Sequence, residues 1–134
     1  MKRNLLGPML LAAMLVVTVA FADAPKEKAK AEGMGGKPAK LTGEIVDMGC
    51  YMGHEAKGEK HMGCATKCIA NGMPMGLLTA DGKLYLITLD HDDADPYNQC
   101  KDWASKQVTL TGPVSERSGM RSIDVTAAQL VAAK

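Results

Sequence analysis

Apolar and polar residues alternate in short segments from residue 41 onward, which is the pattern of β-strands covered on one face. Leu41, Gly43 and Ile45 share one face of the first segment, residues 41–47. A glycine inside a strand is typical of a sharp bend. The next two segments, residues 76–80 and 83–89, flank an Asp-Gly dipeptide. This dipeptide permits the positive backbone angles of a two-residue turn, so the two segments predict a hairpin.

A short helix and two further strands complete the pattern. Asp95 can cap the exposed amides of a helix, and Pro96 suits its first turn. Apolar residues then recur at helical spacing, which predicts a helix of two to three turns. Alternation resumes over residues 108–114 and 120–125, and we expect the last strand to run on toward Leu130.

The predicted order is strand, long insertion, strand, strand, helix, strand, strand. It matches the five-stranded oligonucleotide/oligosaccharide-binding (OB) barrel, whose helix lies between the third and fourth strands. Leu-Thr-Gly occurs at residues 41–43 and again at 110–112, and each glycine stands where a strand could coil around a barrel. We therefore predict a mainly β domain over residues 41–134, an OB-like barrel with a helical insertion at residues 48–75 between its first two strands. A β-sandwich of the same strands is the competing prediction.

The first 22 residues of the 134-residue chain have the pattern of a secretory signal peptide. Lys2 and Arg3 precede an apolar run at residues 5–20, and Ala-Phe-Ala provides an Ala-x-Ala cleavage site. The run is short for a membrane span, and no cysteine follows the cleavage site to carry a lipid anchor. We expect a periplasmic or secreted protein with no stable membrane anchor after cleavage. An uncleaved N-terminal anchor is the alternative.

Charge and composition limit the classes of partner that we expect this chain to bind. Residues 23–40 hold five lysines and three acidic residues and almost nothing to bury, which predicts a disordered linker. Residues 41–134 carry nine Lys/Arg against twelve Asp/Glu, with three tyrosines and one tryptophan as the aromatic residues. Nucleic-acid binding favours a positive surface and stacking aromatics, so we expect no nucleic-acid partner.

The insertion at residues 48–75 concentrates soft ligands. It holds three of the four cysteines, two of the three histidines and five methionines. Residues 61–70 have a helical pattern that ends at Asn-Gly, a favourable helix stop. On that helix His61, Cys64 and Cys68 fall at i, i+3 and i+7 and so project from one face. Cys50, which follows the first strand, can supply a fourth group.

Three cysteines and one histidine satisfy tetrahedral zinc, and thiolates with imidazole also suit copper. The sequence therefore predicts a copper or zinc site at Cys50, His61, Cys64 and Cys68. Thioether sulfur favours copper(I). The additional or replacement ligands that we consider are Met52, His54, Met62, Met73 and Met75. His54 lies in a Gly/Glu/Lys-rich loop that is also typical of a solvated histidine.

Disulfide bonding is a competing interpretation of the same residues. Four cysteines in a small secreted domain most often pair, and Cys50, Cys64, Cys68 and Cys100 allow three connectivities. A bridge between Cys64 and Cys68 is disfavoured by its strict geometry on a regular helix, whereas Cys50 can reach either of them. Cys100, beside Trp103 on the second predicted helix, is most simply a small buried apolar residue. A redox-active thiol pair is the third interpretation.

The motifs around this insertion resemble those of small, uncharacterised secreted or periplasmic bacterial proteins. The resemblance rests on Cys50-Tyr51, on His-x-x-Cys-Ala-x-x-Cys at residues 61–68 and on Gly-x-Pro-x-Gly at residues 72–76. It covers about residues 41–90 and implies a shared domain with a Cys/His cluster, but no activity. We expect a protein that binds copper or zinc, or hands it on to a metal donor or acceptor protein, rather than an enzyme. A disulfide-stapled binding module and a thiol redox protein are the alternatives.

Overall fold

The computed structural model describes residues 36–132. The predicted signal peptide and most of the predicted linker lie outside this range. Its elements, in chain order, are β1 (Lys37–Asp47), α1 (Met48–His54), η1 (Glu59–His61), α2 (Met62–Ala70), β2 (Met75–Thr79), β3 (Leu84–Leu89), α3 (Asp95–Lys101), β4 (Gln107–Arg117), β5 (Met120–Val125) and β6 (Ala127–Leu130). Within this part of the chain, no helix has the length and apolar character needed to span a membrane.

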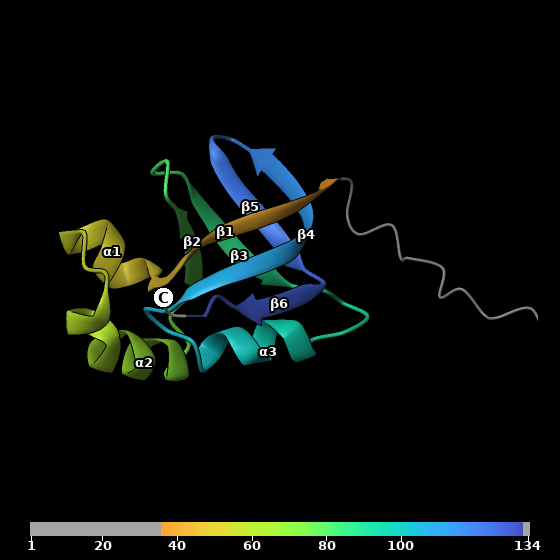
Figure 1. Ribbon diagram of the computed structural model, residues 1–134. Helices are drawn as coiled ribbons and strands as arrows, with labels where there is room; N and C mark the ends of the chain where they lie inside the picture. The colour runs from red at the N-terminus through yellow and green to blue at the C-terminus, as the bar shows by residue number, and fades with distance from the viewer. Residues whose placement is uncertain (1–35, 133–134) are drawn as a thin grey trace, which may run out of the picture.

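Five strands close into a barrel, as predicted from their order. β1 pairs with β2, β2 with β3, β3 with β5, β5 with β4, and β4 returns to β1. The pairing of β3 with β5 is parallel and the others are antiparallel. α3 lies between β3 and β4 in the chain, and Figure 1 shows it below the barrel. This is the OB topology, and the continuous ring of pairing excludes the sandwich.

Two glycines allow β1 and β4 to bend around the barrel. Gly43 pairs with Thr79 of β2 on one side and with Val108 of β4 on the other. A Cβ at Gly43 would lie 2.4 Å from a backbone oxygen of β2, and one at Gly112 would lie 1.8 Å from the backbone oxygen of Asp124. Both approaches are possible only without a side chain, so each Leu-Thr-Gly segment places a glycine where the strand lies against neighbouring backbone.

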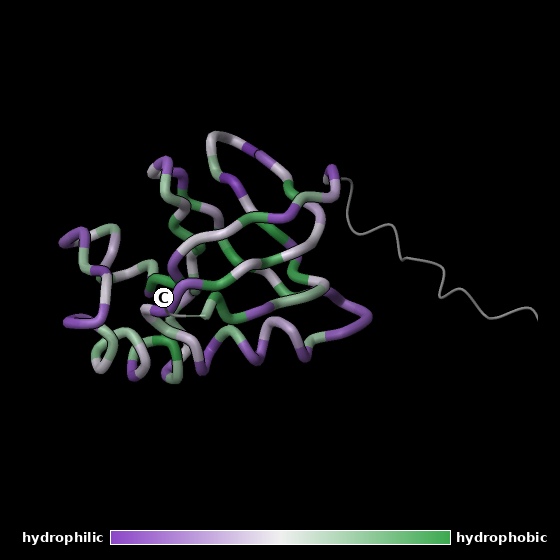
Figure 2. Tube along the Cα trace, in the orientation of Figure 1, coloured by the Kyte–Doolittle hydropathy of each residue, from purple (hydrophilic) through white to green (hydrophobic). Residues whose placement is uncertain are grey.

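The core fills the barrel and continues beneath α2 and α3. Ile45, Leu77, Leu110 and Ile123 come from four different strands and are fully buried. Both helices add small or apolar side chains to the same cluster: Ala65 and Ile69 from α2, and Cys100 from α3. Figure 2 shows hydrophobic residues concentrated on the strands and hydrophilic residues in the loop between α1 and α2. α2 therefore packs on the barrel through one face, and its other face is free to contact the rest of the insertion.

The structure corrects several predicted boundaries. β1 begins at Lys37, inside the segment assigned to the disordered linker, because residues 37–44 pair with β4 through backbone groups that need no apolar side chains. α1 was not predicted, since its glycines weaken the helical pattern. The last strand does not run on unbroken. It bends at Thr126, whose backbone N–H and hydroxyl both donate to the carbonyl of Thr111, and continues as β6.

The close approach at Gly112 makes a testable prediction. Replacing Gly112 by Ala should lower the free energy of unfolding by about 3 kcal/mol or more, because the new methyl group meets backbone that cannot rotate away. Urea denaturation followed by circular dichroism measures this change. Gly53→Ala in α1, where a Cβ meets nothing within 4 Å, is the control and should be neutral or stabilising. Equal stability of the two variants would contradict the account of the bend.

Candidate metal centre

α1 begins where β1 ends because Asp47 caps it. Its carboxylate Oδ1 accepts hydrogen bonds from the backbone N–H of Gly49 at 2.9 Å and of Cys50 at 3.2 Å. These amides would otherwise have no partner in the first helical turn. The helix ends at Glu55, which adopts the left-handed conformation with φ of 54°. The cap therefore places Cys50 in the first turn after the barrel strand.

The second helix brings Cys64 and Cys68 to the same place. α2 spans Met62–Ala70 and is followed by Gly72 with φ of +97°, as the Asn-Gly stop predicts. Its buried residues, Ala65 and Ile69, face the core. Cys64 and Cys68 lie one turn apart on the helix. Figure 1 shows α1 and α2 together at one end of the barrel.

Three cysteine sulfurs meet between these helices. The Sγ atoms of Cys50, Cys64 and Cys68 all lie within 4.8 Å of one another, and those of Cys64 and Cys68 are 4.0 Å apart. A disulfide needs about 2.05 Å between sulfurs. Two thiolates on one ion at about 2.3 Å each would be about 3.8 Å apart at a tetrahedral angle and about 4.0 Å at a trigonal one. The separation of Cys64 and Cys68 therefore suits a shared ion.

A second group of three donors uses Cys50 again. Asp47, Cys50 and His61 each place a ligand atom within 4.8 Å of the other two. Asp47 Oδ2 lies 3.6 Å from His61 Nε2, and both atoms are buried with no hydrogen-bond partner. Sequence reasoning missed Asp47. The feature of the sequence that points to Asp47 is an acidic residue at the end of an apolar strand, three residues before Cys50.

The predicted set of four ligands is thus assembled only in part. Cys50 belongs to both groups, but within residues 36–132 no four donor atoms meet the 4.8 Å spacing together. His61 is therefore grouped with Asp47 and Cys50 rather than with Cys64 and Cys68. His61 lies in η1, just before α2, so its side chain does not follow the regular helical spacing that predicted one shared face with Cys64 and Cys68.

The additional ligands considered from the sequence are one histidine and four methionines. His54 is exposed at the end of α1 and belongs to neither group. Met52 is 69% exposed and lines a hollow with Met48 and Met120, whereas Met62 lines another hollow beside Glu44. Of the other methionines considered, Met75 is buried in the core, whereas Met73 is partly exposed and its thioether sulfur lies close to Gly49 in the first turn of α1.

All four cysteines are free thiols in the structure, so none of the three disulfide connectivities is present. Cys100 is fully buried in the core cluster, and burial raises the pKa of its thiol to about 11. The interpretation of Cys100 as a small buried apolar residue is confirmed. The Sγ atom of Cys50 lies within 4.8 Å of the sulfurs of both Cys64 and Cys68, but no disulfide links it to either.

The pKa values of two thiols in the cluster are raised. The Asp47 carboxylate, which faces the Cys50 thiol, raises the pKa of this thiol to about 12, with burial and Cys64 adding to the effect. Burial and then the neighbouring Cys64 raise the pKa of Cys68. Burial would raise the pKa of Asp47 too, but hydrogen bonds from Cys50 and Gly49 lower it below its usual value. Without a metal, Asp47 is therefore ionised beside protonated thiols.

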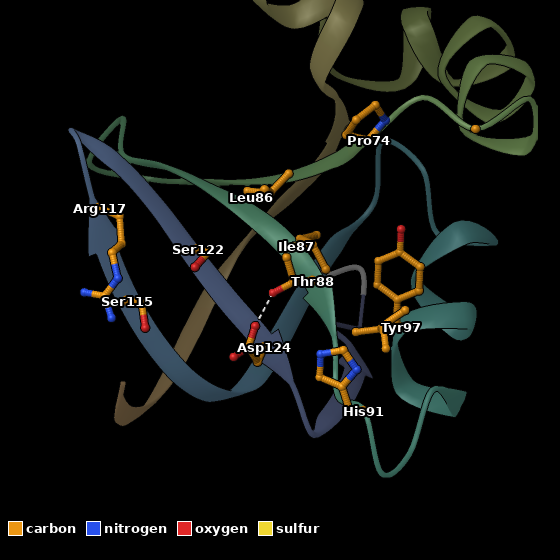
Figure 3. Close-up of a pocket in the computed structure, with 12 residues that line it drawn as sticks. Pro74, Leu86, Ile87, Thr88, His91, Tyr97, Ser115, Arg117, Ser122 and Asp124 are labelled. Atoms are coloured by element: carbon orange, nitrogen blue, oxygen red, sulfur yellow. Dashed lines mark hydrogen bonds between the residues drawn. The ribbon is translucent and has the colours of Figure 1, made fainter. Parts of the chain in front are cut away.

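A separate hollow of about 590 Å³ lies across β3, β4 and β5 beside α3 (Figure 3). His91 and Tyr97 stand at one end, and Ser115 and Arg117 at the other. Thr88 donates a hydrogen bond to the carboxylate of Asp124 across the parallel strand pair. The lining of this hollow includes no cysteine and no member of either donor triad.

Comparisons of the chain with protein-family models, with characterised proteins and with solved structures found no match. The assignment of this site therefore depends on its geometry.

The raised pKa of Cys50 makes a prediction about Asp47. Asp47→Asn keeps an oxygen for the helix cap but removes the negative charge, so the pKa of Cys50 should fall from about 12 toward its usual range. The measurement is the pH dependence of Cys50 alkylation in the reduced, metal-free protein, read by peptide mass spectrometry. Asp102→Asn, an exposed aspartate after α3, is the control. An unchanged alkylation curve for Asp47→Asn would refute the electrostatic cause.

Proposed function

We propose that this protein binds a thiophilic metal ion, zinc or copper(I), at Cys50, Cys64 and Cys68, and that it does so in the periplasm or outside the cell. The observation that carries the proposal is the meeting of three free thiols within 4.8 Å, delivered by two helices. Thiolates are preferred ligands of both ions. The secretory pattern of the first 22 residues supports the location.

The exposure of the triad favours exchange of the ion over permanent storage. Cys64 is exposed and Cys50 and Cys68 are half-buried, so a bound ion is accessible from solvent. Three protein ligands also leave a tetrahedral ion with one open position. A ligand from a donor or acceptor protein can occupy that position during transfer. This supports a role in handing the ion on.

The first prediction of this proposal concerns Cys64. Cys64→Ser should weaken binding of zinc and copper(I) about a hundredfold or more, because it removes one direct ligand of three. Competition with a chromophoric chelator under reducing conditions measures the affinity. Lys67→Ala, an exposed change on the same helix, should bind like the unmodified protein. A reduced protein that takes up neither ion would reject the proposal.

The second prediction concerns pH. Because the pKa values of Cys50 and Cys68 are raised, these thiols carry protons near neutral pH and must release them to bind a metal. Affinity should therefore rise with pH, by about tenfold per pH unit for each thiol that loses its proton. Calorimetric titration in buffers of different ionisation enthalpy counts the released protons. Binding without proton release would contradict the ligand assignment.

A thiol redox function is the second candidate, favoured by the same closeness of three thiols and the exposure of Cys64. The raised pKa values of Cys50 and Cys68 oppose it, since a reactive thiol needs a depressed one. A thiol count on freshly isolated protein separates the two. Four reactive thiols after unfolding, with bound metal, support metal binding, whereas a reversible bridge at Cys50 in metal-free protein supports redox chemistry.

A further inference from the structure

Cys50 belongs to both donor triads. This shared membership supports a further inference, which rests on the metal-binding proposal. We propose that the cluster binds two metal ions, one at Cys50, Cys64 and Cys68 and a second at Asp47, Cys50 and His61. The Cys50 thiolate bridges the two ions. Each ion then has three ligands from the protein.

The distances argue against one ion shared by all five residues. Two donors of one ion can be no farther apart than the sum of their bond lengths, about 4.4 Å for a thiolate and an imidazole. No four of the five donor atoms lie within 4.8 Å of one another in the described chain. Each triad is compact by itself, so two ions, one at each triad, can bind without a change in the positions of the donor atoms.

The second position has its own unsatisfied ligand atoms. Asp47 is 1% exposed, and its Oδ2 and the Nε2 of His61 are buried without a hydrogen-bond partner. Leaving two such groups unpaired is costly in a folded protein. An ion bound to both at about 2.1 Å would hold them about 3.4 to 3.6 Å apart. The 3.6 Å between these two atoms in the structure fits this separation.

The helix cap orients the carboxylate for this role. Oδ1 of Asp47 accepts the backbone N–H groups of Gly49 and Cys50, which holds the carboxylate so that Oδ2 is directed toward His61. Hydrogen bonds that orient a metal ligand are a usual feature of metal sites. The same two hydrogen bonds fix the start of α1 and therefore the position of the bridging Cys50.

Charge balance favours two divalent ions. Three thiolates and one carboxylate carry four negative charges, and two Zn²⁺ ions neutralise them. A single Zn²⁺ would leave two negative charges in a cluster where Asp47 is fully buried and Cys50 and Cys68 are half-buried. Uncompensated charge is strongly disfavoured away from water. Zinc is therefore the appropriate probe.

The test is the zinc stoichiometry of the reduced protein by native mass spectrometry after removal of excess zinc. We expect two ions per chain for the unmodified protein. His61→Ala and Cys64→Ser should each retain one, because each removes a ligand of only one position. Cys50→Ser, which removes the shared ligand, should retain none. Asp47→Asn is a second variant for the same position as His61→Ala and should also retain one.

Controls separate this proposal from the metal-binding proposal itself. His54→Ala changes an exposed histidine outside both triads and should retain two ions. Circular dichroism establishes that each variant is folded. One ion on both the unmodified protein and His61→Ala would overturn the second position and leave metal binding intact. Two ions on both would also overturn it, whereas no ion on any form would reject metal binding as a whole.

Discussion

The carboxylate of Asp47 connects the barrel to the cysteine cluster. It belongs to the last residue of β1, where its backbone pairs with Met75 of β2, and it is almost fully buried. One of its oxygens starts α1 by binding two amides, and the other is directed toward His61. Together with the hydrogen bond from the backbone N–H of Met48 to the carbonyl of Pro74, this side chain fixes the start of α1, and with it Cys50, relative to the barrel. Cys50 is the donor that both groups share, so its position determines whether the other four donor atoms lie close to it.

Packing of α2 on the barrel is the second feature that fixes the position of the cysteine cluster. Ala65 and Ile69 are buried in the same core as Ile45 and Leu77, so hydrophobic packing holds one face of this helix against the strands. The cysteines on the helix stay outside that core and are accessible to solvent. Barrel stability and cluster geometry are therefore linked. We therefore expect a change that loosens the core near Ala65 to alter the positions of Cys64 and Cys68 relative to Cys50.

In the proposed function, protons and metal would compete for the same thiols. An ionised carboxylate beside Cys50 favours the protonated thiol, which raises its pKa to about 12. A bound cation reverses this effect, because the carboxylate and the thiolates then attract the ion together. The raised pKa values keep Cys50 and Cys68 protonated near neutral pH, and in the proposed function they would make metal uptake sensitive to pH. This behaviour suits transfer of a metal better than attack on a substrate.

The sequence alone determined the barrel and the region of the site. Alternation, the Asp-Gly turn and the Asp-Pro helix start are local signals that predicted the strand order, although Asp95 is the first residue of α3 and not its cap, which is Ala94. The two Leu-Thr-Gly segments correctly marked Gly43 and Gly112 as special positions, because both lie against neighbouring backbone. The clustering of cysteines likewise identified residues 48–75, and Cys50, Cys64 and Cys68 do meet. Only the tertiary structure separated His61 from the two α2 cysteines and brought in Asp47. The separation of donor atoms depends on how α1, η1 and α2 pack against the end of the barrel, and a linear pattern carries no information about such distances.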